Sequence, residues 1–180
     1  GADGIGECRH HLVAAVVAGL VAVGYASLFR LAHEAALWVL ATAPYALLAL
    51  TPACFLLGWW LVRRFAPGAS GSGIPQVMAA NDLDENRHGV ALRTLIGWRV
   101  VVVKIVSSLL CVLGGGAVGR EGPTIQISAT LFHGIGMPFR KLSPEVTHQA
   151  LIVAGGAAGI ASAFNTPLGG IVYGIEELAT

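Results

Sequence analysis

The sequence has few charged residues and few cysteines. Asp, Glu, Lys and Arg make up 12% of its 180 residues, whereas about 25% of the residues in an ordinary soluble domain are charged. The formal net charge is only +1 and the basic residues are scattered, so no nucleic-acid partner is expected. The three cysteines lie far apart and have neither disulfide nor metal-ligand spacing. No metal site and no cofactor are expected.

Long segments of the sequence contain no charged residue. Leu12 to Phe29, Ala35 to Val62 and Ala150 to Ile175 each contain no Asp, Glu, Lys, Arg or His. Segments of about 20 apolar residues are long enough to cross a bilayer as helices. The composition therefore predicts an all-α, multi-pass protein of the cell membrane, surrounded by the lipid bilayer.

The first two apolar segments are expected to form two antiparallel crossings. Residues 11 to 41 read as one long helix, in which Arg30 and Glu34 are spaced i, i+4 and can pair. Arg9 precedes the first crossing, and Arg63-Arg64 follow the second. Because basic residues favour the cytoplasmic side of a membrane, we place these three arginines in the cytoplasm.

Lys104 lies inside the third apolar segment, which runs from Trp98 to Leu113, and it is the single charged residue between Val100 and Gly119. Two interpretations are open: the side chain snorkels or pairs with an acid, or it is a fixed positive charge that raises the local potential for an anion. His33 has no second metal-type residue at ligand spacing, so it is read as a packed or interfacial residue.

Glycine and proline interrupt the other apolar segments. Residues 149 to 178 are broken by Asn165-Thr166-Pro167, and Ser143-Pro144-Glu145 is typical of a helix start. Gly155-x3-Gly159 and Gly115-x3-Gly119 predict close approach of helices in a membrane. Short, broken helices are typical of transporters in which helix ends lie inside the membrane.

Three segments share a pattern that begins a helix within apolar sequence. They are Ser72-Gly73-Ile74-Pro75, Glu121-Gly122-Pro123 and Asn165-Thr166-Pro167. Each places a cap-type residue or a glycine before a proline that suits the first helical turn. A helix start leaves unpaired N–H groups and about half a positive charge. We expect the three starts to point at one location and to bind an anion there.

Acidic and hydroxyl side chains near these segments are candidates for the chemistry. Ser72 can donate its hydroxyl to an anion, or it only caps its own helix. Glu121 can compete with an anion for N–H groups and withdraw when protonated, or it pairs at the surface with a neighbouring base. Glu176 and Glu177 follow 26 uncharged residues and are either a helix end returning to water or a proton acceptor on the cytoplasmic side.

Together, three motifs resemble those of the chloride channel and chloride/proton antiporter (CLC) family. Gly71-Ser72-Gly73-Ile74-Pro75 is similar to the family's first anion-site motif, and Gly119-Arg120-Glu121-Gly122-Pro123 is similar to its gating-glutamate motif. The segment from Gly156 to Gly170, continuing to Glu176-Glu177, resembles its third signature. The order and spacing of the three motifs also match, and the resemblance covers nearly the whole chain.

The resemblance implies a helical membrane fold of two inverted halves, with one ion pathway in each subunit of a homodimer. It implies that chloride is bound at Ser72, Gly73, Arg120 and Gly122, with helix starts contributing. It implies that Glu121 is the outer gate and proton carrier. Glu177 falls where the family's antiporters keep an inner proton glutamate, and this favours exchange of chloride for protons.

The match leaves part of the family's pattern unfilled. A second half normally supplies an anion motif of the Gly-x-Phe-x-Pro type and a pore tyrosine, and neither is found in this sequence. We therefore interpret residues 1–180 as one partial transmembrane domain, the first inverted-topology repeat with tilted and broken helices. Such a half is expected not to transport alone.

The function expected of the whole protein is chloride/proton antiport. There are two alternatives: a passive voltage-gated chloride channel and an assembly fragment that does not transport. An enzyme is not expected, because the six histidines are spread through polar segments and show no catalytic pairing.

Overall fold

The computed structural model describes residues 3–83, 85–138 and 147–178, and within these ranges the chain is helical without a strand. The predicted all-α class is confirmed. Ser143-Pro144-Glu145, the predicted helix start, lies outside the described residues. The helices are α1 (Asp3–Thr42), α2 (Leu47–Phe65), α3 (Ile74–Asp82), α4 (Glu85–Leu95), α5 (Trp98–Leu113), α6 (Glu121–Gly136), α7 (His148–Phe164) and α8 (Pro167–Tyr173), with short turns η1 (Pro44–Ala46), η2 (Pro67–Ala69) and η4 (Gly174–Leu178).

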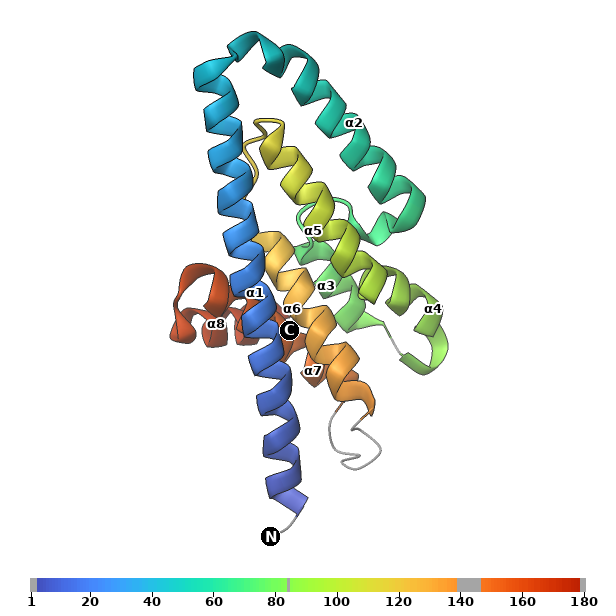
Figure 1. Cartoon of the computed structure of the whole chain (residues 1–180). Helices are drawn as coiled ribbons and strands as arrows, with labels where there is room; N and C mark the ends of the chain where they lie inside the picture. The colour runs from blue at the N-terminus through green and yellow to red at the C-terminus, as the bar shows by residue number, and fades with distance from the viewer. Residues whose placement is uncertain (1–2, 84, 139–146, 179–180) are drawn as a thin grey trace.

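Helices α1 and α2 run in opposite directions on either side of η1, and α5 packs against both (Figure 1). The predicted long first helix is confirmed, and Pro44 occupies the first turn of the short helix that reverses the chain. Arg30 Nε and Glu34 Oε1 are 3.9 Å apart, as their spacing predicted. Within the part of the chain that the structure describes, three helical stretches are long and apolar enough to cross a membrane: Leu12–Thr42, Pro44–Phe65 and His88–Leu113.

Helix α6 is the centre of the fold. All its residues from Gly122 to Phe132 are buried, and its most extensive packing is against α7. A β-carbon on Gly155 would lie 2.7 Å from the α-carbon of Ala129, and one on Gly159 would lie 2.8 Å from the α-carbon of Ile125. Because only glycine permits this approach, the predicted Gly155-x3-Gly159 packing is confirmed.

The second glycine pair does not behave in the same way. Residues 116–119 form an extended connection between α5 and α6 rather than a helix. Gly115 has φ +83°, a left-handed conformation that glycine adopts without a steric penalty. The interpretation of Gly115-x3-Gly119 as a helix-packing motif is therefore wrong, and its glycines instead let the chain turn back from α5 towards the start of α6.

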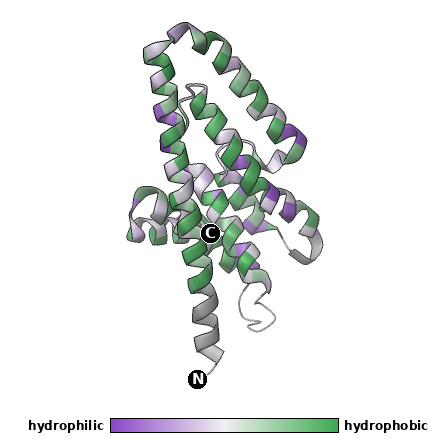
Figure 2. Ribbon diagram, viewed as in Figure 1, coloured by the Kyte–Doolittle hydropathy of each residue, from purple (hydrophilic) through white to green (hydrophobic). Residues whose placement is uncertain are grey.

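The outer surfaces of α1 and α2 are apolar. Figure 2 shows hydrophobic residues along most of both helices, and large side chains such as Leu20, Trp38, Leu56 and Trp59 are exposed. An exposed apolar surface of this extent is characteristic of contact with lipid or with another part of a membrane protein.

Candidate functional site

Two of the predicted helix starts meet in the structure. Ser72 and Gly73 precede α3, and Gly122 lies in the first turn of α6. A β-carbon on Gly122 would overlap the carbonyl oxygen of Ser72, and one on Gly73 would lie 2.9 Å from the carbonyl oxygen of Gly122. The two backbones are therefore in direct contact, although 50 positions separate Ser72 from Gly122 in the sequence.

Free backbone donors gather at this contact. Among the described residues, the first backbone hydrogen bonds into the two helices run from Val77 N–H to the carbonyl oxygen of Gly73 and from Thr124 N–H to that of Arg120. Within the same residues, no backbone acceptor is found for the N–H groups of Ser72, Gly73 or Gly122. The prolines at the starts have no N–H group. Two sets of unpaired donors with the partial positive charge of two helix starts thus lie side by side.

Ser72 does not cap its own helix. The N-cap of α3 is Gly73, whose φ of +107° is a left-handed conformation, and no side-chain hydrogen bond caps the helix. The Ser72 residue is exposed. The self-capping interpretation is therefore wrong, and Ser72 is an exposed residue beside the paired helix starts.

Lys104 holds the segment that leads into α3. Only 2% of this residue is exposed, and its Nζ donates hydrogen bonds to the carbonyl oxygens of Ala69 at 3.1 Å and Gly71 at 2.7 Å. It neither snorkels nor pairs with an acid. Because its partners are neutral carbonyls, the full positive charge stays close to Ser72, which is compatible with the second interpretation of this lysine.

Gln126 holds the same segment from the other side, and sequence reasoning missed it. It is buried on α6, and its Nε2 donates to the carbonyl oxygens of Gly68 at 2.8 Å and Leu95 at 2.9 Å. The available signal was the single amide side chain of this helix, since a buried amide requires polar partners. Lys104 and Gln126 together fix the backbone that presents Ser72.

Replacing Lys104 tests this anchoring. We expect Lys104→Met to destabilise the fold by about 1–3 kcal/mol, because two carbonyl oxygens lose their buried donor. Thermal unfolding in detergent would measure the effect. Arg93→Met, which removes an exposed positive charge from the last turn of α4, is the control and should be nearly neutral. Equal unfolding temperatures for the two variants would contradict an anchoring role.

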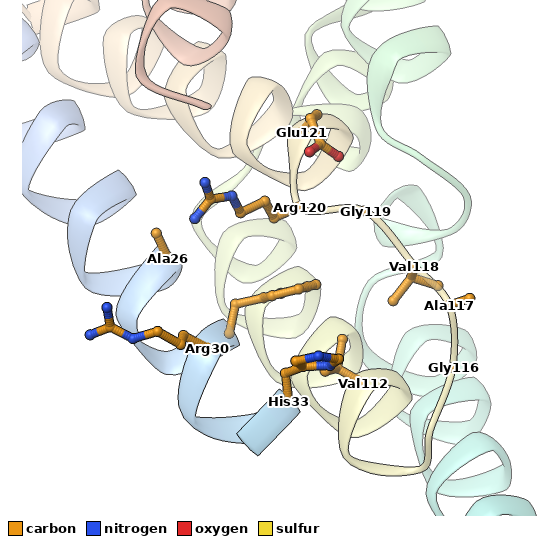
Figure 3. Close-up of a pocket in the computed structure, with 11 residues that line it drawn as sticks. Ala26, Arg30, His33, Val112, Gly116, Ala117, Val118, Gly119, Arg120 and Glu121 are labelled. Atoms are coloured by element: carbon orange, nitrogen blue, oxygen red, sulfur yellow. The ribbon is translucent and has the colours of Figure 1, made fainter. Parts of the chain in front are cut away.

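Glu121 is the first residue of α6 and is half-buried. Its carboxylate lies over Gly119, where a β-carbon would overlap it. No ion pair joins it to another described residue, so pairing with a neighbouring base is not found. Glu121 and Arg120 line a pocket of about 450 Å³ between α1 and residues 116–121, and Figure 3 shows both residues at the end of this connection.

The third predicted helix start does not join the other two. The residues of Asn165-Thr166-Pro167 are exposed, and the short helix α8 packs chiefly on α7 and η4. Figure 1 shows α8 on the opposite side of α1 from α3. The expectation that three starts share one location is corrected to two, because the left-handed Asn165 (φ +54°) turns the chain away after α7.

Glu176 and Glu177 lie at the other end of α3 from Ser72. Both are exposed in η4, and the next residue, Leu178, is buried against the core. Asn81 Nδ2 donates to the carbonyl oxygen of Leu178 at 2.8 Å. Since Asn81 is seven positions after Ile74 in this helix, the anchor lies roughly 10 Å from the start of α3. The two acidic positions, Glu121 and Glu177, are thus associated with opposite ends of α3.

The fold and the site define an all-α membrane protein in which two helix starts meet and a half-buried acid stands beside them. The model of the voltage-gated chloride channel family matches residues 53–180. The chain belongs to this family, as its motifs predicted.

Named relatives agree with this assignment. The chain is 42% identical over 146 residues to H(+)/Cl(-) exchange transporters ClcA from Salmonella arizonae and Salmonella newport, covering 81% of this chain and 28% of each relative. A crystal structure described as a slow cyanobacterial Cl-/H+ antiporter superposes with a TM-score of 0.71 at 30% identity, over 94% of this chain and 39% of the antiporter chain. The predicted membrane location and chloride-channel fold are confirmed. The chain spans less than a third of the length of the ClcA relatives.

Proposed function

We propose that this chain is part of a chloride/proton antiporter, as one partial transmembrane domain over residues 1–180. The contact between Ser72-Gly73 and Gly122, with Glu121 at the start of the same helix, is the observation that carries the proposal. Because of this contact, free backbone N–H donors lie next to a titratable acid. The ClcA relatives, which are named exchange transporters, support the same conclusion.

The anion binds through partial charges rather than through a salt bridge. Ser72, Gly73 and Gly122 supply hydroxyl and backbone donors, and Arg120 adds positive charge at the pocket. The buried charge of Lys104 lies behind the segment before Ser72 and strengthens the field without contacting the anion. Binding through such groups is weak enough for release, which rapid transport requires.

Glu121 alternates with the anion. Ionised, its carboxylate accepts hydrogen bonds from the donors that would otherwise hold chloride. When it is protonated, the side chain no longer competes with chloride for these donors and moves aside. Chloride then occupies the site that the carboxylate has left. No further cofactor is required, because chloride and protons are the transported partners. The whole protein acts as a homodimer in the cell membrane, with one pathway in each subunit.

Glu177 delivers protons from the cytoplasmic side in this proposal. In the full-length protein, Glu177→Gln is expected to stop proton movement while chloride flux continues, because an amide cannot exchange a proton at neutral pH. Simultaneous chloride-electrode and pH recordings from proteoliposomes would measure both fluxes. Glu176→Gln, the same change at the adjacent position, should keep them coupled. Intact coupling in Glu177→Gln would remove the main support for antiport.

A passive chloride channel is the second candidate, because the matching family is described as voltage-gated chloride channels. The same recordings separate the two functions, since a channel moves chloride down its gradient without moving protons. A third possibility is an assembly fragment that does not transport. Comparing chloride flux from liposomes that contain the full-length protein with flux from liposomes that contain residues 1–180 alone tests it, and we expect flux only from the former.

A further inference from the structure

The last turns of α2 carry exposed side chains that no step of the proposed transport uses. Leu56, Trp59 and Trp60, which we call the apolar stripe of α2, are all exposed. Arg63 is seven positions after Leu56, and residues spaced by three, four and seven positions share one face of a helix. Arg63 and Arg64 are exposed too, and Figure 2 shows the apolar α2 ribbon becoming hydrophilic at its end. This face of α2 therefore changes from aliphatic to aromatic to cationic along the chain.

The cationic end of α2 lies at a membrane interface. The apolar span Pro44–Phe65 has 22 residues, about 33 Å of helix, which matches the roughly 30 Å of a bilayer core. Three of the four tryptophans of the chain are at this end: two in α2, and Trp98 at the start of α5, where Val62 packs against the cluster that contains Val100. Because tryptophan is enriched at the headgroup level and basic residues favour the cytoplasmic side, this end reaches the headgroups of the cytoplasmic leaflet.

Aromatic rings, rather than acids, hold the two guanidinium groups. The Cζ atom of Arg63 lies 5.2 Å from the centre of the Trp59 ring, and that of Arg64 lies 5.6 Å from the centre of the Phe65 ring. The rings of Trp60 and Phe65 meet edge to face, with their centres 5.6 Å apart. Neither arginine has a hydrogen bond or an ion pair with another described residue. Cation–π contacts restrict both side chains without neutralising their charge, so their N–H groups remain free for an anionic ligand.

We propose that the end of α2 binds an anionic phospholipid of the cytoplasmic leaflet, with Arg63 and Arg64 on its phosphate group and one acyl chain along the apolar stripe. Guanidinium groups present paired N–H donors that match phosphate oxygens. A soluble anion fits the arginines but not the stripe, and a neutral lipid fits the stripe but does not use the two charges. Anionic lipids of the cytoplasmic leaflet attract basic residues beside a membrane span. The site is independent of the proposed transport, because none of its residues binds chloride or carries a proton there.

Lipid binding to the full-length protein tests the proposal. Native mass spectrometry of the detergent-solubilised protein would compare phosphatidylglycerol with phosphatidylcholine of the same acyl chains, and the wild type should bind phosphatidylglycerol more tightly. Arg63→Gln is expected to weaken phosphatidylglycerol binding about fivefold, the contribution of one basic residue beside an anionic lipid surface, and to leave phosphatidylcholine binding unchanged. The matched control is Arg93→Gln, which removes an exposed arginine from α4, a helix without aromatic residues. It should bind both lipids as the wild type does.

Glycerophosphoglycerol, which has the headgroup without the acyl chains, separates a lipid site from a site for soluble phosphate esters. At the concentration of the lipid it should not displace phosphatidylglycerol, and displacement would overturn the lipid assignment. Equal losses in Arg63→Gln and Arg93→Gln would overturn the site, because they would reflect the overall charge of the surface, and so would the absence of any loss in Arg63→Gln. If Arg63→Gln does not fold, Arg64→Gln takes its place with the same expectations. A wild type that does not prefer phosphatidylglycerol to phosphatidylcholine rejects the proposal without any variant.

Discussion

Glu121→Gln in the full-length protein is expected to abolish proton movement while chloride flux continues. The amide has the shape of a protonated carboxyl group but cannot bind or release a proton in the neutral pH range. It also lacks the negative charge that competes with chloride for the N–H donors beside Gly122. Proton uptake driven by a chloride gradient should therefore fall to the background of protein-free liposomes.

The control for this variant is Glu34→Gln, which removes a carboxylate near the same pocket but away from the helix starts. It should keep chloride and proton fluxes coupled. Proton movement that persists in Glu121→Gln, at the stoichiometry of the wild type, would show that another group carries the proton.

Gly122→Ala is expected to have the second large effect. The added β-carbon would overlap the carbonyl oxygen of Ser72 and lie 3.0 Å from the carbonyl carbon. The neighbouring backbone cannot move away without straining the hydrogen bonds by which Lys104 and Gln126 hold the segment before Ser72. We expect a loss of about 1–3 kcal/mol in stability, as for overpacking of a core. The added β-carbon should also displace the two helix starts. If this displacement weakens anion binding by about 1.4 kcal/mol, the affinity for chloride falls about tenfold.

Gly19→Ala provides the matched control, because a β-carbon at this position of α1 meets nothing within 4 Å. Alanine is the better helix former, so this variant should be neutral or slightly more stable. Thermal unfolding and chloride-binding calorimetry would compare the two variants. If Gly122→Ala behaves like Gly19→Ala in both measurements, the contact between the helix starts has no functional importance.

The local structure of the chain could be predicted well from the sequence. Apolar length and the positions of proline located α1, α5 and the break between α7 and α8, because these features depend on neighbouring residues. The motif at Gly155-x3-Gly159 predicted packing for the same reason: it lies within one helix. Gly115-x3-Gly119 has the same spacing but lies outside a helix, so spacing alone could not distinguish a packing surface from a non-helical connection.

The arrangement of the site depends on contacts between distant segments, and these were harder to predict. The sequence indicated helix starts at Ser72, Glu121 and Asn165, but only tertiary packing decides that the first two meet and the third does not. Lys104 was recognised as unusual, yet its backbone carbonyl partners carry no side-chain signal. Arg30 was read only as a partner for Glu34, because nothing in the sequence places α1 beside the connection that leads to Glu121.

Bromide binding to crystals of the full-length protein tests the central claim most directly, because bromide can replace chloride and is located by its anomalous scattering. The account predicts a bromide peak within hydrogen-bonding distance of the Ser72 hydroxyl and the backbone donors beside it. It predicts a second peak in Glu121→Gln, at the place that the carboxylate occupies in the wild type. Bromide peaks found only elsewhere, with none near Ser72 or Gly122 in either protein, would contradict it.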